Sequence, residues 1–300
     1  MATRKFLVVY HRVDYDGLFS ALIAKSYLKS KGITVETLGW NYGDELPNLD
    51  KLIRYNSGIV LTDISFPANA MKTLKESAKA TWIDHHVTAI QDSEEHGYSD
   101  MPGLRKNGVA ACELTWKYYW KDKPIPQIVQ MAGAYDVWDK NRFDWSEVVA
   151  LQYGLKDLYG HNLGKLDTHW EDLCEDSEWL QDRGEVIYGW LQKQSEGWVT
   201  RCGFPVKVAG RFSGIAIITP LAGSLVFESV LEKYDLFLVL QINDGGTKYN
   251  VSLYTEPSKN LDFSCGEYMK QFGGGGHKTA AGCNNIGEEM FKKIIFDHEF

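Results

Sequence analysis

Apolar residues in the first half of the chain follow two different spacings. Residues 6–10 form a short continuous apolar run of the buried-strand type, and the patterns at residues 33–40, 58–62 and 80–84 also predict strands. Apolar residues at helical spacing, such as Leu18, Leu22 and Leu28, predict helices over residues 18–31 and 69–79. Strands that alternate with helices favour a parallel sheet with helical crossovers. The pattern therefore predicts an α/β domain at the N-terminal end.

Helical spacing dominates the middle of the chain. It predicts helices over residues 108–119 and 124–134, and Pro124 and Pro126 suit the start of the second. Asp136 is then expected just past a helix end. Residues 167–198 form a long charged stretch that we expect to be helical and to connect two domains. Its tryptophans are expected to pack in a core, and they are Trp170, Trp179 and Trp190.

Strand-type patterns return beyond residue 201. They predict strands at residues 206–209, 214–218, 236–242 and 249–254. The last two flank Asn243-Asp-Gly-Gly246, which is a hairpin signal. Helical patterns over residues 225–234 and 266–271 complete a small α+β domain. We therefore predict an α/β N-terminal domain over residues 1–185, a helical linker over 186–205 and a smaller α+β C-terminal domain over 206–300.

Composition and charge exclude some classes of partner. The chain has 300 residues, 44% of them hydrophobic, which suffices for two cores. A net charge of −8 argues against binding long duplex nucleic acid, whose phosphates require many Lys and Arg. Five cysteines without a C-x-x-C pair suggest neither disulfides nor a structural zinc site, and we expect them to be reduced and mostly buried. No apolar stretch is long enough for a membrane span, so we expect a cytoplasmic protein.

Acidic and histidine residues follow several of the predicted elements. Asp84 ends the predicted strand at 80–84, and His85 and His86 come directly after it, where a sheet opens into a loop. Two adjacent histidines alone are more often an ordinary loop pair. Comparable residues follow other elements, namely His11, Asp14, Asp16, Asp63 and Asp136. Such a set can hold two divalent ions if one carboxylate bridges them, and it favours Mn²⁺ or a similar ion over a thiolate zinc site. Phosphoryl hydrolysis is the chemistry that such an ion pair supports.

A glycine-rich stretch lies near the C-terminal end. Four glycines at 273–276 precede His277 and Lys278. Glycines let a backbone approach a ligand closely and present N–H groups to a phosphate. Four glycines in isolation would more often be a flexible turn. Their place between a predicted helix and Ala280-Ala281-Gly282 favours a phosphate-binding loop.

Two motifs together resemble the DHH phosphoesterases: Asp84-His85-His86 and Gly274-Gly275-Gly276-His277 followed by Ala-Ala-Gly. The resemblance covers nearly the whole chain. It implies that one Mn²⁺ is held by His11, Asp14 and Asp63, and a second by Asp16, Asp63, His85 and Asp136. Mg²⁺ or Co²⁺ are possible substitutes. It also implies that His86 contacts the scissile phosphate and that Asp84 orients its neighbours, so both are catalytic candidates.

The same resemblance implies a substrate and leaves its identity open. Gly274, Gly275, Gly276 and His277 would bind its phosphate or terminal nucleotide. The leading expectation is a phosphodiesterase that cuts short single-stranded oligonucleotides into mononucleotides, in a protein that can form a homodimer. Alternatives are a phosphatase of 3′-phosphoadenosine 5′-phosphate, a linear or cyclic dinucleotide phosphodiesterase, and a non-catalytic nucleotide sensor. Many members carry an Arg two residues after a strand Ser, where this chain has Tyr254, which can stack on a base but cannot bind a phosphate as Arg does.

Overall fold

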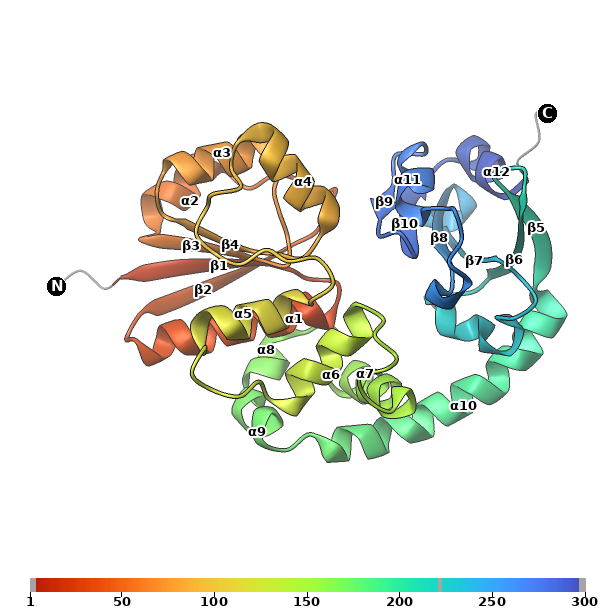
Figure 1. Cartoon of the computed structure of the whole chain (residues 1–300), viewed down its shortest axis with the longest axis horizontal. Helices are drawn as coiled ribbons and strands as arrows, with labels where there is room; N and C mark the ends of the chain where they lie inside the picture. Colours follow the sequence, from red (N-terminus) through yellow and green to blue (C-terminus); the bar gives the residue numbers. More distant parts are fainter. Residues whose placement is uncertain (1–3, 221–222, 297–300) are drawn as a thin grey trace. The chain divides into compact units, whose positions relative to one another are not determined.

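The protein is described by a computed structural model that covers residues 4–220 and 223–296. Its internal contacts divide the chain into two units, Met1–Tyr188 and Gly189–Phe300. Each unit has its own sheet and its own hydrophobic core. The α/β first unit, the helical middle and the second unit with its separate sheet confirm the predicted fold class (Figure 1).

The first unit is built on a four-stranded sheet. Its strands are β1 (Lys5–His11), β2 (Thr34–Trp40), β3 (Gly58–Thr62) and β4 (Ala80–Ile83). They lie in the order β2-β1-β3-β4, and every neighbouring pair is parallel. The predicted parallel sheet is therefore confirmed. β3 is buried along its whole length, which explains its uninterrupted apolar sequence.

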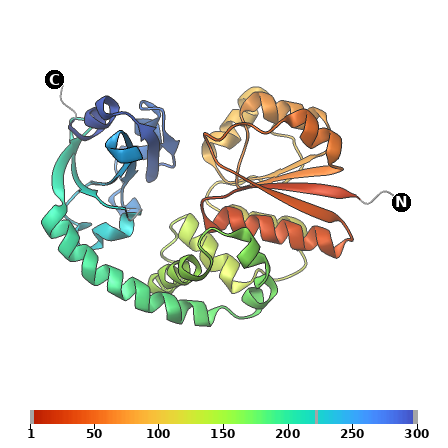
Figure 2. The same cartoon turned by 180° about the vertical axis from the view of Figure 1, so that it is seen from behind.

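Helices cover both faces of this sheet (Figures 1 and 2). One face carries α1 (Tyr15–Ser30) and α5 (Ala111–Tyr119), and the other carries α2 (Leu49–Tyr55), α3 (Ala68–Glu76) and α4 (Val87–His96). The apolar spacing did not predict α2 or α4. α2 is only seven residues long and has no fully buried residue, although Leu49, Leu52 and Ile53 lie at helical spacing and pack partly buried against the core. α4 buries only Ala89 and Ser93 and has no continuous apolar stripe.

Further helices follow in the first unit, the last of which continues into the second unit, and one prediction about them is wrong. They are α6 (Gln127–Asp136), α7 (Trp145–Tyr159), α8 (Leu163–Asp167), α9 (Trp170–Glu175) and α10 (Glu178–Cys202). Pro126 caps α6 as expected, but Asp136 is the last residue of that helix, not a residue beyond it. The stretch 167–198 is largely helical as expected, and it forms two helices because Asp176 ends α9 in extended backbone.

The tryptophans of this region divide between core and surface. Trp170 is buried and contacts Phe19, as expected. Trp179 and Trp190 are 45% and 56% exposed, so the prediction of core packing is wrong for both. Both lie on α10, whose sequence offers no sharply apolar face and therefore allows large rings on the solvent side.

The second unit holds a mixed six-stranded sheet in the order β5-β6-β7-β8-β10-β9. Its strands are β5 (Phe204–Val208), β6 (Phe212–Ile218), β7 (Leu236–Asn243), β8 (Lys248–Tyr254), β9 (Gly275–Gly276) and β10 (Ala280–Ile286). The predicted hairpin is confirmed, since β7 and β8 pair antiparallel around 244–247. The helix expected over 225–234 is instead the 3₁₀ helix η1 (Ser224–Val230). α11 (Cys265–Lys270) and α12 (Glu288–Phe296) pack on this sheet.

The cysteines are all free thiols, as expected. Cys112, Cys265 and Cys283 are buried, whereas Cys202 is exposed. Within residues 4–220 and 223–296, no helix combines the length and the apolar character that crossing a membrane requires.

Two glycines bring α7 and the start of α10 into backbone contact. A Cβ on Gly154 would lie 2.1 Å from the Leu180 carbonyl oxygen, and one on Gly184 would lie 1.7 Å from that of Ala150. Both distances are far below any real Cβ contact. The two helices can pack this closely only because neither glycine has a side chain.

We expect Gly184→Ala to destabilise the protein, although alanine normally favours a helix over glycine by about 1 kcal/mol. The added methyl would force α7 and α10 apart, at a cost of about 1–3 kcal/mol. The matched control is Gly189→Ala in the same helix, where a Cβ meets nothing within 4 Å. Thermal unfolding of both variants checks this, and equal or higher stability of Gly184→Ala than of the control would contradict it.

Candidate metal centre

The carboxyl ends of the four parallel strands bring the predicted residues to one sheet edge. His11 is the last residue of β1, Asp63 follows β3, and Asp84 and His85 follow β4. The chain leaves β1 toward β2 and then crosses back to β3. Ligands bind α/β sheets at such a reversal of strand order, outside the carboxyl ends of the strands.

The turn between β1 and α1 folds back on the end of β1. Asp14 caps α1, and its Oδ1 accepts a hydrogen bond from the Gly17 amide at 2.9 Å. Its other oxygen lies 2.7 Å from His11 Nδ1. A Cβ at Gly17 would lie 2.0 Å from the His11 carbonyl oxygen, so this turn requires glycine. His11 and Asp14 are thus held together by the helix cap.

Asp16 is buried in the first turn of α1 and also joins α1 to α5. Its Oδ2 accepts a hydrogen bond from the Ala111 amide at 2.8 Å, and its Oδ1 accepts one from the Cys112 amide at 2.6 Å. These are the first two residues of α5, where the helix dipole favours a negative charge. Each carboxylate oxygen retains a lone pair for a further partner.

Asp63 lies between the two histidines that the resemblance assigns to different ions. Its backbone is left-handed, with φ of 59°, a conformation that Asp adopts more readily than most residues. Its Oδ2 lies 3.5 Å from His11 Nδ1, and its Oδ1 lies 3.3 Å from His85 Nε2. This is the position that a bridging ligand would need.

His85 is buried among three carboxylates. Its Nε2 lies 3.6 Å from Asp16 Oδ2, 3.3 Å from Asp63 Oδ1 and 3.4 Å from Asp136 Oδ2. A single N–H group of this ring cannot donate a good hydrogen bond to all three carboxylates at once. Asp136, at the end of α6, thereby joins residues that are more than 45 positions away in the sequence.

Asp84 is fully buried, and its side chain contacts residues that are close to it in the sequence. Its Oδ2 accepts a hydrogen bond from Trp82 Nε1 at 3.1 Å. Its Oδ1 accepts bonds from the His85 and His86 amides and lies 2.7 Å from His86 Nδ1. These contacts fix the direction of the His86 ring, which agrees with an orienting role for Asp84.

The charges of the cluster shift the pKa values of its members in opposite directions. Burial works against the charged form of His11, but Asp14 and Asp63 outweigh it and raise the pKa to about 11. The pKa of His85 rises to about 11 for the same reason. Burial raises the pKa of Asp136 to about 7 and that of Asp16 well above its usual range. Burial also opposes the ionised form of Asp63, but the neighbouring His11 and His85 rings lower its pKa. The buried carboxylates therefore stabilise a positive charge beside them, whether it is a proton on a histidine or a bound cation.

The donor atoms fit divalent ions. Two buried carboxylate oxygens, Asp63 Oδ1 and Asp136 Oδ2, make no hydrogen bond within the described residues. Two groups could each hold an ion because their donor atoms lie within 4.8 Å of one another: His11, Asp14 and Asp63, and Asp16, His85 and Asp136. Imidazole and carboxylate ligands without thiolates suit Mn²⁺, Fe²⁺ or Zn²⁺. The structure thus brings together all six residues predicted as metal ligands, together with Asp84 and His86.

The sequence reasoning missed two residues beside this cluster, Asn41 and Tyr42. Asn41 Oδ1 lies 3.0 Å from His11 Nε2, and the ring of Tyr42 lies against His11 and His86. Both follow β2 directly. A polar residue just after a predicted strand was the available signal, because that strand ends at the same sheet edge as the others.

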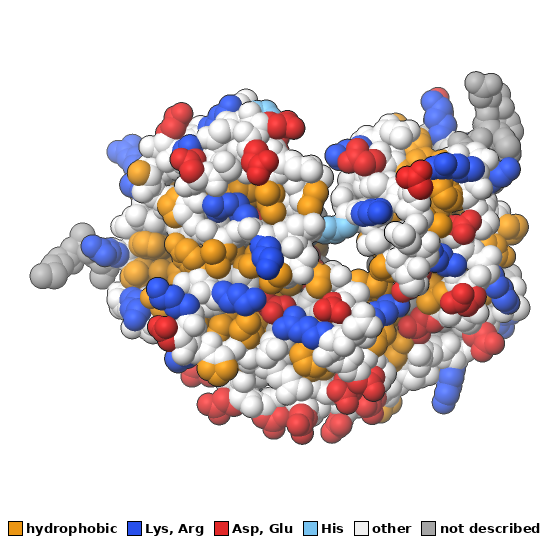
Figure 3. Space-filling model, in the orientation of Figure 1, with side chains coloured by type: hydrophobic (Ala, Val, Ile, Leu, Met, Phe, Trp, Pro, Cys, Tyr) orange, Lys and Arg blue, Asp and Glu red, His pale blue; other side chains and the backbone are white. Residues whose placement is uncertain are grey.

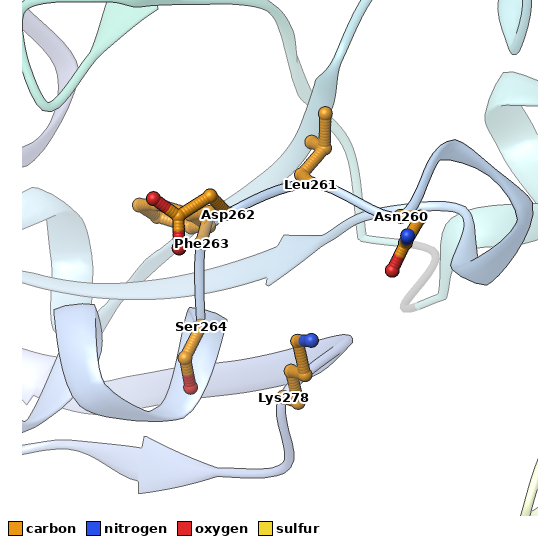
Figure 4. A pocket seen from close by; sticks show the side chains of 6 residues that line it. All are labelled: Asn260, Leu261, Asp262, Phe263, Ser264 and Lys278. Atoms are coloured by element: carbon orange, nitrogen blue, oxygen red, sulfur yellow. The ribbon is translucent and has the colours of Figure 1, made fainter.

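The predicted glycine-rich loop belongs to the second unit. Gly275 and Gly276 form β9, and the His277 carbonyl accepts a hydrogen bond from the Gly266 amide of α11. A pocket of about 470 Å³ borders this loop and is lined by Asn260, Leu261, Asp262, Phe263, Ser264 and Lys278. Figure 4 shows the polar ends of Asn260 and Lys278 turned toward the same opening. The sequence did not predict this pocket.

Two curated proteins are related to the chain at low identity, whereas no family model matches it. The chain is 24% identical to the uncharacterized protein R106 of Acanthamoeba polyphaga mimivirus, over 92% of this chain and 66% of that protein. It is 23% identical to oligoribonuclease NrnB of Bacillus subtilis, over 96% and 74% of the two chains. The chain thus spans about two thirds and three quarters of the length of these relatives.

Solved structures share its fold over nearly the whole chain. The DHH domain of a member of a family of ribosomal proteins has a TM-score of 0.64 at 15% identity, covering 97% of this chain and 84% of that one. A pGpG-specific phosphodiesterase, PggH of Vibrio cholerae, has a TM-score of 0.53 at 17% identity, covering 97% and 96%. RecJ of Thermus thermophilus in complex with Mn²⁺ has a TM-score of 0.54 at 14% identity, covering 97% and 51%.

The fold and the two motifs agree with the sequence relationship to NrnB. The chain has the fold of a solved DHH domain. Its Asp84-His85-His86 motif follows β4, so this motif is part of the candidate metal centre formed by the buried Asp and His residues.

We expect Asn41→Ala to weaken metal binding by about 10- to 100-fold, because its contact with Nε2 orients the His11 ring toward Asp14 and Asp63. Titration of the purified variant with Mn²⁺ measures the change in Kd. The control is Asn48→Ala, which removes the cap of α2 and has no contact with the cluster. Equal Mn²⁺ affinity of the wild type and Asn41→Ala would contradict the orienting role.

We expect Mn²⁺ binding near pH 7 to release about one proton or more per chain, because His11 and His85 are protonated in the metal-free cluster and must lose a proton to bind. Affinity for Mn²⁺ therefore falls as the pH falls. Calorimetry in buffers of different ionisation enthalpy measures the released protons. Binding heats that do not depend on the buffer would show that the histidines are already neutral.

Proposed function

We propose that this protein is a metal-dependent phosphodiesterase that hydrolyses short oligonucleotides to mononucleotides, with Mn²⁺ as its metal. The observation that carries the proposal is the buried Asp and His cluster at the carboxyl edge of the first sheet, with Asp63 between its two halves. A cluster that is this acidic and this buried is costly without cations. Bound ions would remove that cost.

Each half of the cluster would hold one ion, the first through His11, Asp14 and Asp63, and the second through Asp16, Asp63, His85 and Asp136. Two such ions supply a water that is a nucleophile at neutral pH and positive charge that stabilises a phosphoryl group during its displacement. The protein contributes the placement of these side chains. Asp14 is held by its hydrogen bond to the first turn of α1, and Asp16 by the first amides of α5. The left-handed backbone at Asp63 sets the direction of its side chain.

His86 would contact the scissile phosphate. Its Nδ1 is directed to Asp84, so the ring would meet the substrate through Nε2. Burial lowers the pKa of His86, but the charge of Asp84 outweighs burial and raises it. A protonated His86 could donate a hydrogen bond to a phosphate oxygen and stabilise charge that develops there. Asp84 would act by keeping this ring in position.

The preference for short substrates is supported by the distribution of charge. The net charge is −8, and on the face drawn in Figure 3 Lys and Arg side chains are interspersed with Asp and Glu. Acidic side chains gather over α9 and the start of α10 on that face. A long strand or duplex needs a continuous basic track, whereas a few nucleotides need only local contacts.

The names of two similar proteins support the same class of substrate. One is an oligoribonuclease, and the other is a pGpG-specific phosphodiesterase whose chain is matched over 96% of its length. Both names describe cleavage within short ribonucleotides. For the glycine-rich loop, Gly274 to Gly276 and His277, we propose binding of a substrate phosphate through backbone N–H groups.

Hydrolysis of 5′-labelled RNAs of two to five nucleotides tests the proposal, beside 3′-phosphoadenosine 5′-phosphate and cyclic dinucleotides. We expect mononucleotides to be released with Mn²⁺ and not with EDTA. We expect Asp63→Asn and His86→Ala to lower kcat by about 100- to 1000-fold, because each removes electrostatic stabilisation at the phosphate or its metals.

The matched control is His96→Ala, whose histidine is exposed on α4 and contacts Asp92. It should retain wild-type kcat. Release of phosphate only from 3′-phosphoadenosine 5′-phosphate would replace the proposal with a phosphatase. Nucleotide binding without turnover in any metal would replace it with a sensor.

A further inference from the structure

An exposed tyrosine stands at the histidine side of the metal cluster. The ring centroid of Tyr42 lies 5.9 Å from that of His11 and 6.1 Å from that of His86, in T-shaped arrangements. The residue nevertheless leaves 47% of its surface exposed. The exposed part of this ring is therefore within reach of a group attached to a phosphate at His86.

The turn that carries Tyr42 is held firmly. Asp44 Oδ2 accepts a hydrogen bond from the Asn41 amide at 2.8 Å, and Arg12 donates to both oxygens of Asp44 at 2.9 to 3.2 Å. The Tyr42 hydroxyl accepts a bond from the Ser65 amide at 3.4 Å. The ring is thus placed before a substrate arrives, which lowers the entropic cost of binding.

Trp40 supports the same turn from behind. Its ring lies 5.8 Å from that of Tyr42, and its Nε1 donates a hydrogen bond to the Glu45 carbonyl at 3.1 Å. Trp40 is itself buried and packs edge-on against Phe66. Phe66, Trp40 and Tyr42 therefore form a row of edge-on aromatic contacts that leads from the core of the sheet to the surface beside the cluster.

Other apolar side chains are exposed next to the cluster residues. Val13 directly precedes Asp14 and is 41% exposed, and Val87 directly follows His86 and is 37% exposed. Metal ions and inorganic phosphate gain nothing from exposed apolar groups. A nucleoside has an aromatic base that does, and base–aromatic stacking accepts any base.

We propose that Tyr42 contacts the base of the nucleotide whose phosphate is bound at the metal cluster, and that it is a specificity-determining residue for nucleotides over other phosphate esters. This inference rests on the proposed function. It assigns the turn after β2 to substrate recognition, in addition to the contact that Asn41 makes with His11. Recognition by stacking favours nucleotides as a class without selecting one base.

The test compares a dinucleotide with its abasic analogue, in which one base at a time is replaced by an abasic unit. We expect Tyr42→Ala to raise KM for the intact dinucleotide roughly tenfold, with kcat changed by less than about twofold. Its KM for the analogue that lacks the contacted base should equal that of the wild type. Tyr42→Phe, which keeps the ring and loses the hydroxyl, should remain within about twofold of the wild type on both substrates.

The matched control is Tyr55→Ala, a tyrosine that is 63% exposed at the end of α2. Tyr55→Ala should leave KM and kcat unchanged for both the dinucleotide and its abasic analogue. The proposal is overturned if Tyr42→Ala impairs intact and abasic substrates equally, if it weakens Mn²⁺ binding, or if it changes nothing. The first two outcomes would assign Tyr42 to the placement of the histidines.

Failure of the proposed function is distinguishable from failure of this inference. If the wild type hydrolyses neither substrate, the proposed function is wrong, and the Kd of the dinucleotide in Mn²⁺ decides the inference. Weaker binding by Tyr42→Ala, with equal binding of the abasic analogue, would support the base contact. Equal Kd values of wild type and variant for the intact dinucleotide would refute it.

Discussion

Repulsion among carboxylates at one sheet edge is the constraint on which the rest of this structure depends. Asp16, Asp63 and Asp84 are buried, and Asp136 is more than three quarters buried. Buried negative charges this close together are stable only when each has a compensating partner. The fold provides those partners from β1, α1, β4 and α5.

The partners of these acids differ in kind. Asp84 is satisfied by Trp82 and by the amides that follow it, and Asp16 is bonded to the first amides of α5. By contrast, Asp63 and Asp136 each keep one buried oxygen without a hydrogen bond in the described part of the chain. A metal-free cluster compensates with protons on its histidines. Bound cations would replace those protons.

The rim of the cluster follows a different physical rule from its centre. The centre is charged and buried, whereas Val13, Tyr42 and Val87 at the rim are apolar and partly exposed. Charged groups recognise a phosphate, and apolar groups recognise what is attached to it. The buried Trp40 and the Arg12–Asp44 pair hold the Tyr42 ring in a position where it is partly exposed to water. Exposure of an apolar ring is unfavourable, and a bound ligand would cover it.

The sequence by itself determined the parallel sheet, the order of its strands along the chain, the hairpin of the second unit and all the acids and histidines of the cluster. These follow from local patterns, because buried strands are continuously apolar and functional residues follow strand ends. A helix that buries little, such as α4, left no such pattern. Only the tertiary structure decided that Asp16 caps α5, that Asp136 ends a helix beside His85, and that Asn41 and Tyr42 belong to the site. Those contacts join residues far apart in the chain, and side-chain spacing along a sequence carries no record of which distant elements meet.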